Sequence, residues 1–160
     1  MPSDIPANMP EIERLFATAP FIRDLGLKLK TAGPGRCETV LQLTERHLQQ
    51  DGVVHAGVLA TMADHTSGTA GASLVGPGEY VLTAEFKINL LRAARSKRLH
   101  CVGKVLKPGR RLIVAESEVF DGDPQKAPLV AKATVTLAVM TKPSRENSDP
   151  GRSPSPVAKE

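Results

Sequence analysis

The chain has 160 residues with a formal net charge of +4, a length that fits one domain with a sizeable buried core. Its two cysteines, Cys37 and Cys101, do not form a C-x-x-C pair, which argues against a zinc site and a disulfide-built scaffold. No apolar run approaches the ~20 residues that cross a bilayer, and no secretory signal is expected. We therefore expect a cytoplasmic protein without a membrane anchor.

Three regions follow one another along the chain. Residues 1–23 are predicted to be a leader with one short amphipathic helix, whose apolar side holds Ile12, Leu15 and Phe16. Residues 24–142 are predicted to form the folded domain. The composition of residues 143–160 cannot bury enough apolar area to offset chain entropy, and this predicts a disordered tail.

The hydrophobic period changes several times within the domain. Two strands are predicted first, then one long helix that ends at Gly76-Pro77-Gly78, then four strands. The predicted ranges are 25–30 and 36–44 for the first strands, 56–75 for the helix, and 79–93, 97–107, 110–121 and 128–141 for the last strands. This order predicts an α+β fold in which an antiparallel sheet covers a single helix.

The predicted helix combines many small residues with one carboxylate, Asp64, in the stretch HAGVLATMADHTSG. Each interior glycine costs about 1 kcal/mol relative to alanine, which is tolerable where the helix backbone must approach a sheet closely. From spacing alone, Asp64 points either to solvent at an edge or into the protein. Because an unpaired buried charge is expensive, a buried Asp64 would need partners or a function.

Two segments carry a resemblance to a known family. The pattern DGVVHAGVLATMAD over 51–64, followed by TAEFKINLLRAA over 83–94, resembles the hotdog-fold acyl-CoA thioesterases of the phenylacetate-pathway type, in the 4-hydroxybenzoyl-CoA thioesterase-like superfamily. The similarity covers roughly residues 20–141. It implies a hotdog fold and hydrolysis of acyl-CoA thioesters to free acid and coenzyme A, which is part of the substrate, so that no cofactor is expected.

The resemblance assigns the acidic residue of the family to Asp64 and its second hydroxyl position to Thr83. Two positions depart from the family pattern: Gln49 stands where asparagine is usual, and Ala56 stands where the first glycine is usual. An amide donor does not require glycine, although the methyl group of Ala56 narrows the approach of the acyl group. Gln49 would replace asparagine as a longer hydrogen-bonding amide.

The chemistry of thioester hydrolysis fits these assignments. It needs an activated water or nucleophile and donors aimed at the oxygen that becomes negative. A helix N-terminus offers free N–H groups and partial positive charge, so the amides of Ala56 and Gly57 are candidate oxyanion donors. Asp64 would act as general base or as nucleophile, and Thr83 would hold the water. His55 would orient the thioester carbonyl or only bond to the helix start.

The resemblance also implies a homo-oligomer, a dimer or a dimer of dimers (homotetramer), with the sites between two protomers. We expect Asp64 and the oxyanion amides to belong to one helix, and Thr83 to line the same pocket from the neighbouring protomer.

Basic residues are concentrated between residues 87 and 115, where nine Lys or Arg occur without any Asp or Glu. Such a cluster is typical of a site for a phosphorylated ligand, and Arg95, Arg110 and Arg111 are the candidates for the phosphates of coenzyme A. A solvated polar face is the other interpretation. Nucleic acid is not expected as a partner, because the chain has no Trp, one Tyr and four Phe and hence few stacking platforms.

Other functions remain as alternatives. The first is a hotdog protein that binds acyl-CoA or an acyl chain without cleaving it, although an acid in the acyl pocket has little use there. A hotdog dehydratase would pair its acid with a histidine in a different motif. No metal is expected, because no histidines and carboxylates have metal-ligand spacing. His65 is expected to be structural, and His47 and His100 are expected at the surface.

Overall fold

The computed structural model describes residues 8–142, so the tail predicted over 143–160 and residues 1–7 of the predicted leader lie outside the described residues. Three α-helices, two short 3₁₀ turns and six strands make up the described part. Within it, none of the helices has the length and apolar character needed to span a membrane. The helices are α1 (Met9–Thr18), α2 (Pro20–Leu25) and α3 (Ala56–Ala72), and the strands are β1 (Leu27–Gly33), β2 (Arg36–Gln42), β3 (Glu79–Leu90), β4 (Arg98–Lys107), β5 (Leu112–Phe120) and β6 (Leu129–Thr141).

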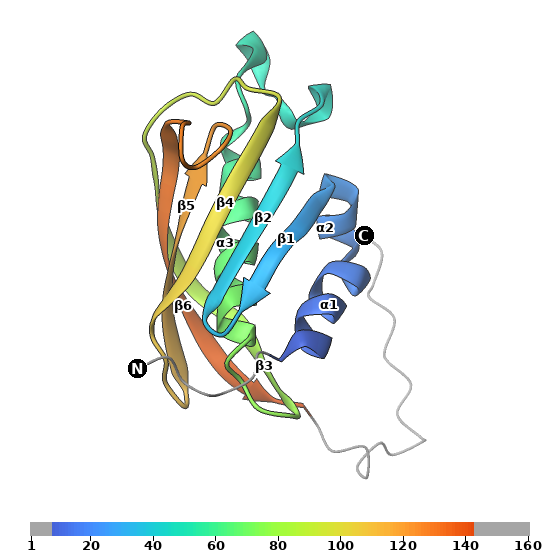
Figure 1. Ribbon diagram of the computed structural model, residues 1–160, viewed down its shortest axis with the longest axis vertical. Helices are drawn as coiled ribbons and strands as arrows, with labels where there is room; N and C mark the ends of the chain where they lie inside the picture. Colours follow the sequence, from blue (N-terminus) through green and yellow to red (C-terminus); the bar gives the residue numbers. More distant parts are fainter. Residues whose placement is uncertain (1–7, 143–160) are drawn as a thin grey trace, which may run out of the picture.

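The six strands form one antiparallel sheet in the order β1-β2-β4-β5-β6-β3, and the sheet curves round α3 (Figure 1). On β6, the buried residues Ala133, Val135 and Leu137 alternate with less buried ones, as expected of a strand with one face toward a core. The predicted α+β hotdog fold is confirmed, with one sheet wrapped round one long helix.

The small residues of α3 allow the sheet to approach it closely. A Cβ atom at Gly71 of α3 would collide with the Leu137 side chain of β6. A Cβ atom at Gly103 of β4 would lie 2.9 Å from the carbonyl oxygen of Thr66 of α3. Met62 and Ala63 are 0% exposed, so this helix is surrounded on most sides. The cost of its glycines is thus offset by close packing against β4 and β6.

The N-terminal helices differ from the predicted leader. Helix α1 packs on the domain, with Ile12 completely buried, and the backbone N–H of Asn8 donates to the carbonyl of Ser73 at the end of α3. Helix α2 was not predicted. It begins at Pro20, a residue favoured in the first turn of a helix, and ends at Leu25, followed by Gly26, whose φ of +84° is the left-handed conformation of a helix C-cap. The first strand consequently begins at Leu27 and not at 25.

A charge cluster fixes α1 to the end of β6. The carboxylate of Glu11, 5% exposed, accepts hydrogen bonds from Arg14 on α1 and from Lys142 after β6. The Arg14 bond, followed by the bond from Lys142, lowers the pKa of Glu11 to about 2. Helix α1 is therefore tied to the end of β6, and it lies beside the edge strand β1 (Figure 1).

Strand β3 is an edge strand that pairs only with β6 among the described strands. It has 12 residues, and both of its faces are largely exposed, including Leu82 at 52%, Phe86 at 42% and Leu90 at 52%. A long edge with unpaired backbone groups and apolar side chains is a typical place for association with a second chain.

Two histidines predicted at the surface are buried. His47, 2% exposed, bonds through Nε2 to the carbonyl oxygen of Leu25 at 2.8 Å. His100, also 2% exposed, bonds through Nε2 to the Glu38 carboxylate at 2.9 Å. The prediction was wrong because each ring finds a polar partner that is distant in sequence, and a partnered histidine can be buried without loss.

Candidate active site

Asp64 and Thr83 form a hydrogen-bonded pair within one chain. The hydroxyl of Thr83 on β3 donates to Oδ1 of Asp64 on α3 at 2.7 Å. Burial raises the pKa of Asp64, and the bond from Thr83 opposes that rise. The carboxylate is half-buried. Of the two orientations that the spacing allowed, Asp64 therefore points into the protein and not to solvent.

A β-bulge in β3 sets the direction of Thr83. The register with β6 shifts between Thr83, opposite Leu137, and Glu85, opposite Thr136. Thr83 therefore shares the inner face with buried Leu137, and Glu85 lies on the outer face, where it accepts a bond from Thr136. Phe86 returns to the inner face opposite Val135. A bulge of this kind re-aims side chains next to functional sites.

The pair opens into a small cavity, the Asp64 hollow, with a volume of about 160 Å³. Helix α3, strands β3 and β6, and helix α1 line it. Its lining residues are Leu15, Asp64, His65, Gly68, Thr69, Val81, Leu82, Thr83 and Leu137. Apart from the Asp64 pair, His65 and Thr69, these residues are apolar, so the hollow is suited to an apolar group placed beside the carboxylate.

The start of α3 is capped by His55. Its Nδ1 atom accepts the Gly57 N–H at 2.9 Å, so His55 acts as the helix N-terminal hydrogen bonder that was one of its two predicted roles. The amide of Gly57, a predicted oxyanion donor, is thus engaged by its own chain. The amide of Ala56 lies at the first helical position, where no earlier turn supplies an acceptor.

Gln49 and Ala56 line a second cavity, the helix-start hollow, of about 420 Å³. Its other wall is formed by the last residue of β3, Leu90, and by the segment after it, including Leu91 and Arg92. The structure thus brings Asp64 and Thr83 together at one place and Gln49, His55, Ala56 and Gly57 at another. Gly57 and Asp64 are seven residues apart on one helix, a separation of about 10 Å along the axis.

This geometry corrects the expected division of the site. The oxyanion amides and Asp64 were assigned to one protomer and Thr83 to the other. Thr83 instead bonds to Asp64 of its own chain. A thioester carbonyl at the carboxylate is about 10 Å from the amides of the same helix, too far for hydrogen bonds of about 3 Å.

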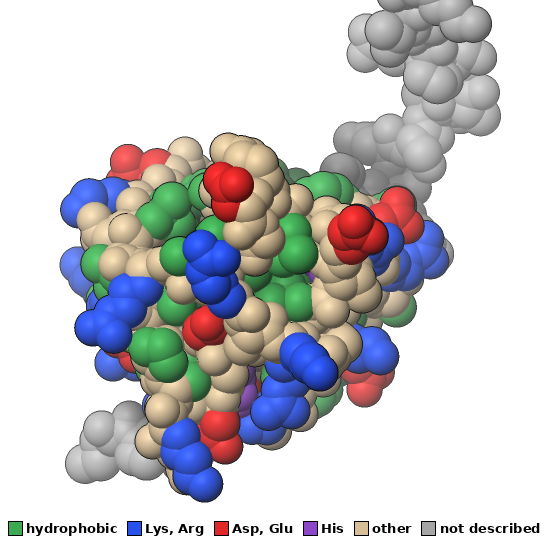
Figure 2. Space-filling view, turned by 90° about the horizontal axis from the view of Figure 1, so that it is seen from above, with side chains coloured by type: hydrophobic (Ala, Val, Ile, Leu, Met, Phe, Trp, Pro, Cys, Tyr) green, Lys and Arg blue, Asp and Glu red, His purple; other side chains and the backbone are tan. Residues whose placement is uncertain are grey.

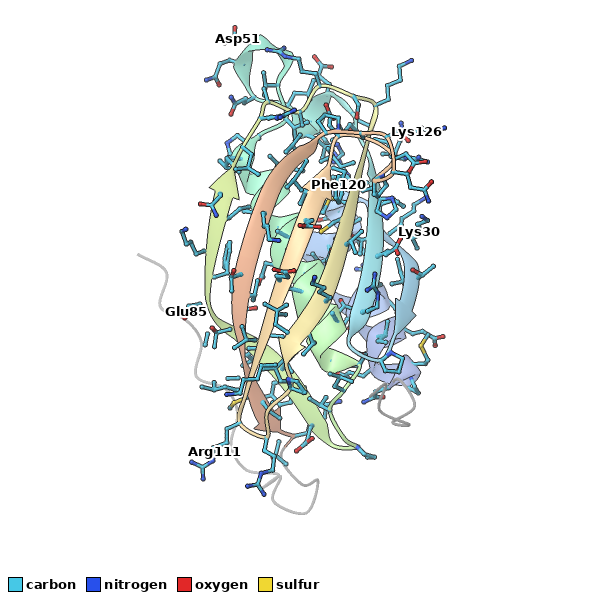
Figure 3. The ribbon with its side chains drawn as sticks, turned by 60° about the vertical axis from the view of Figure 1, so that its left-hand side comes forward. Lys30, Asp51, Glu85, Arg111, Phe120 and Lys126 are labelled. Carbon is cyan, nitrogen blue, oxygen red and sulfur yellow. The ribbon has the colours of Figure 1, made fainter. Side chains whose placement is uncertain are left out.

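The three predicted phosphate-binding arginines lie at two ends of the molecule. The backbone N–H of Arg95 donates to Asp121, which follows β5, and its guanidinium donates to the carbonyl oxygen of Asp51. Arg110 and Arg111 precede β5. That strand has nine residues, or about 30 Å, and Figure 3 shows Asp51 and Arg111 at opposite ends. One nucleotide cannot contact all three residues within one chain.

Arg92 was not singled out from the sequence, although it lines the helix-start hollow. Figure 2, which views the molecule from above, shows Lys and Arg side chains next to hydrophobic ones on this side. The sequence feature that could have indicated Arg92 is its position directly after the apolar pair Leu90-Leu91, where β3 ends. Among residues 8–142, no group of three His, Cys, Asp or Glu side chains is placed to hold a metal.

His65 lines the Asp64 hollow from the position next to the catalytic candidate. Its ring packs edge-on against Phe16 of α1 with centroids 4.8 Å apart. Within the described part of the chain, its buried Nε2 atom has no hydrogen-bond partner. Burial lowers the pKa of His65 to about 4, so the ring is neutral at pH 7.

We expect His65 to make the protein less stable in mild acid. The unfolded chain takes up this proton near pH 6.5, whereas the folded chain takes it up near pH 4, so stability falls as the pH decreases from about 6.5 to 4. Between pH 7 and 5 this contributes about 1–2 kcal/mol. Urea unfolding of wild type and His65→Leu at both pH values measures it. An equal pH-dependent loss in the two proteins would contradict the assignment.

Comparisons with known proteins agree with this architecture. The sequence pattern of the Thioesterase superfamily matches residues 51–128. A solved thioesterase family protein from Silicibacter pomeroyi is 33% identical, with a TM-score of 0.80, over 83% of this chain and 98% of that chain. The 1,4-dihydroxy-2-naphthoyl-CoA hydrolase of Escherichia coli is 27% identical over 72% of this chain and 83% of its own length. The PaaI protein of the E. coli phenylacetic acid degradation operon, at 18% identity, shares the fold, with a TM-score of 0.75 over 84% of this chain and 94% of its own.

Proposed function

The chain belongs to the thioesterase superfamily, and we propose that this thioesterase hydrolyses acyl-CoA to the free acid and coenzyme A. The observation that carries the proposal is the Asp64–Thr83 pair, a half-buried carboxylate facing a hollow of about 160 Å³ that is otherwise mostly apolar. Both cysteines are free and buried, which suits the reducing cytoplasm where we expect the protein to act.

The carboxylate of Asp64 supplies the reactive electron pair. As general base, it takes a proton from a water that attacks the thioester carbon; the tetrahedral intermediate then expels the thiolate of coenzyme A. As nucleophile, it attacks the same carbon, expels the thiolate and leaves a mixed anhydride that water hydrolyses. Both routes need the ionised acid. Its raised pKa makes it a stronger base than an exposed aspartate, and the bond from Thr83 fixes one of its oxygens.

A second protomer would complete this site. The oxyanion donors must come from outside the Asp64 protomer's own helix start, which is about 10 Å away. Antiparallel pairing of two β3 edges about the strand centre would place Leu90 of the partner subunit level with Glu79. Leu90 lines the helix-start hollow together with Ala56, so this pairing would bring the partner's helix start toward Asp64. It would also cover the exposed apolar side chains of β3.

The proposal is tested by measuring release of free thiol from a panel of aryl and alkyl acyl-CoA thioesters, with oligomeric state determined by native mass spectrometry. We expect turnover of at least part of the panel by a dimer or a dimer of dimers. Binding of acyl-CoA without any thiol release would instead support the non-catalytic binding protein.

For the nucleotide of coenzyme A we propose Arg95 together with Arg92, because Arg92 lines the helix-start hollow and the Arg95 guanidinium donates to the carbonyl of Asp51, a few residues before α3. The earlier candidates Arg110 and Arg111 could reach the nucleotide only from a partner subunit. We expect Arg92→Ala/Arg95→Ala to raise KM more than it lowers kcat, since phosphate contacts stabilise the ground and transition states alike. Arg110→Ala/Arg111→Ala should raise KM less.

The matched substrate for this prediction is the acyl-pantetheine thioester, which lacks the nucleotide. Its KM should be nearly the same for wild type and Arg92→Ala/Arg95→Ala. If KM for acyl-pantetheine rises as much as that for acyl-CoA, the two arginines support the loop at Asp51 and do not bind phosphate. A larger KM increase in the Arg110/Arg111 variant would move the nucleotide site to the other end of the sheet.

A further inference from the structure

A third cavity, partly apolar, lies close to the Asp64 hollow. This lower hollow has a volume of about 360 Å³. Its lining comes from the segment after α3, from β3, β5 and β6, and from the turn between β4 and β5. The residues are Leu74, Val75, Glu79, Pro108, Gly109, Arg110, Ile113 and Val139. Neither the family comparison nor the proposed reaction assigns it a role.

The two hollows are neighbours along β6 and along α3 with the turn that follows it. Leu137 lines the Asp64 hollow and Val139 lines the lower hollow; they lie two residues apart on β6, or about 7 Å. Thr69 on α3 lines the Asp64 hollow, and Leu74, in the turn that follows α3, lines the lower hollow. One continuous space between α3 and the sheet would therefore exist if a side chain did not divide it.

Leu137 is that dividing side chain. It is 0% exposed, lies opposite Thr83 on β3 and Ile113 on β5, and sits directly against the backbone of Gly71. A Cβ atom at Gly71 would collide with its Cδ1 atom. The absence of a side chain at 71 is thus what lets Leu137 reach the helix and close the end of the Asp64 hollow.

We propose that Leu137, packed on Gly71, sets the upper size limit of the acyl group. An apolar cavity of about 150 Å³ holds one benzene molecule, so the Asp64 hollow at about 160 Å³ takes one aromatic ring or a short alkyl chain. Longer alkyl chains would have to pass Leu137 to enter the lower hollow. This inference rests on the proposed function, since it assumes that the acyl group lies beside Asp64.

The test is a chain-length profile of Leu137→Ala, measured as kcat/KM for phenylacetyl-, butanoyl-, octanoyl- and dodecanoyl-CoA. Wild type should favour the first two. In the variant, the ratio of dodecanoyl- to butanoyl-CoA should rise about tenfold or more, because each methylene in an apolar pocket changes discrimination by roughly 10-fold or more. Leu99→Ala is the matched control: Leu99 is also 0% exposed but lies on β4, away from both hollows.

A buried Leu→Ala change lowers the free energy of unfolding by about 2–5 kcal/mol. Leu137→Val is therefore included as a smaller truncation, for which the ratio of dodecanoyl- to butanoyl-CoA should also rise. An equal change of the ratio in the Leu99 control, or none in a folded Leu137 variant, would overturn the proposal, as would a wild type that already prefers dodecanoyl-CoA. Binding of non-hydrolysable acyl-CoA thioethers, measured by calorimetry, should show the same length limit. If no thioester is hydrolysed but this limit is present, the proposed function fails and the role of Leu137 stands.

Discussion

Replacing Asp64 by asparagine should leave a folded, assembled protein whose kcat is lower by about 10²–10⁴, the range typical of a lost general base. Asparagine keeps the shape of the side chain and can still accept the hydroxyl bond of Thr83 at the Oδ1 position. It cannot take up a proton or attack the thioester. Thiol release by the variant, with circular dichroism and native mass spectrometry as folding controls, measures the effect.

Thr83→Val supplies a pH signature for the same pair. The hydroxyl of Thr83 stabilises the ionised form of Asp64 and so lowers its pKa against the effect of burial. Without it, the pKa of Asp64 rises further, and the acid limb of kcat/KM should move to higher pH. An acid limb that stays in place in Thr83→Val, or full activity in folded Asp64→Asn, would remove the pair from the mechanism.

The second large effect concerns the oxyanion amide of Ala56. Ala56→Pro removes this N–H at the first position of α3, where proline is well accommodated. The preceding residue, His55, already has φ −64° and ψ 136°, the extended conformation that proline requires before it. We expect a stable protein whose kcat falls by about 10²–10³, as for loss of one oxyanion donor.

This variant also tests the two-chain site. In a heterodimer of Asp64→Asn and Ala56→Pro protomers, one site carries both changes and the other carries neither. Heterodimers purified through two different tags should therefore regain about half of wild-type activity. Asp64→Asn combined with Thr83→Val is the control. Because these two residues bond within one chain, neither site of that heterodimer is wild type, and its activity should not exceed that of the Thr83→Val dimer at the same pH. Recovery in the control alone would restore the division of residues first expected from the sequence.

Periodicity was sufficient to predict the order of elements in the domain. The alternation in β6 and the small residues of α3 each follow from a neighbour that covers one face of the element, and such patterns survive in the sequence. Element ends were less certain: the helix predicted over 56–75 ends at Ala72, and the last predicted strands lose one to three residues at an end. Helix α2 was missed because six residues are too few to show a helical period.

Asp64 was found from the sequence because a lone carboxylate interrupts an apolar helix. Its partner was assigned to the wrong chain because the contact depends on a bulge. Simple alternation from Thr83 would have placed Glu85 on the same face; the register shift makes Phe86 the next inner residue. No composition rule marks that shift. The sequence likewise did not predict that the arginines lie at opposite ends of β5. Residues 95 and 110 are close in sequence, but the length of a strand separates them in space.

The bulge in β3 makes this strand consist of two halves of opposite phase. Before Ala84, odd-numbered residues such as Thr83 face the helix, and after it even-numbered ones such as Phe86 do so. If a single residue were lost or gained there, every later side chain of the strand would move to the opposite face of the sheet. Glu85 would enter the apolar side while Phe86 left it. Over evolutionary time the length of this segment should therefore be fixed more strictly than its amino-acid identities, in contrast to surface loops, where insertions are tolerated.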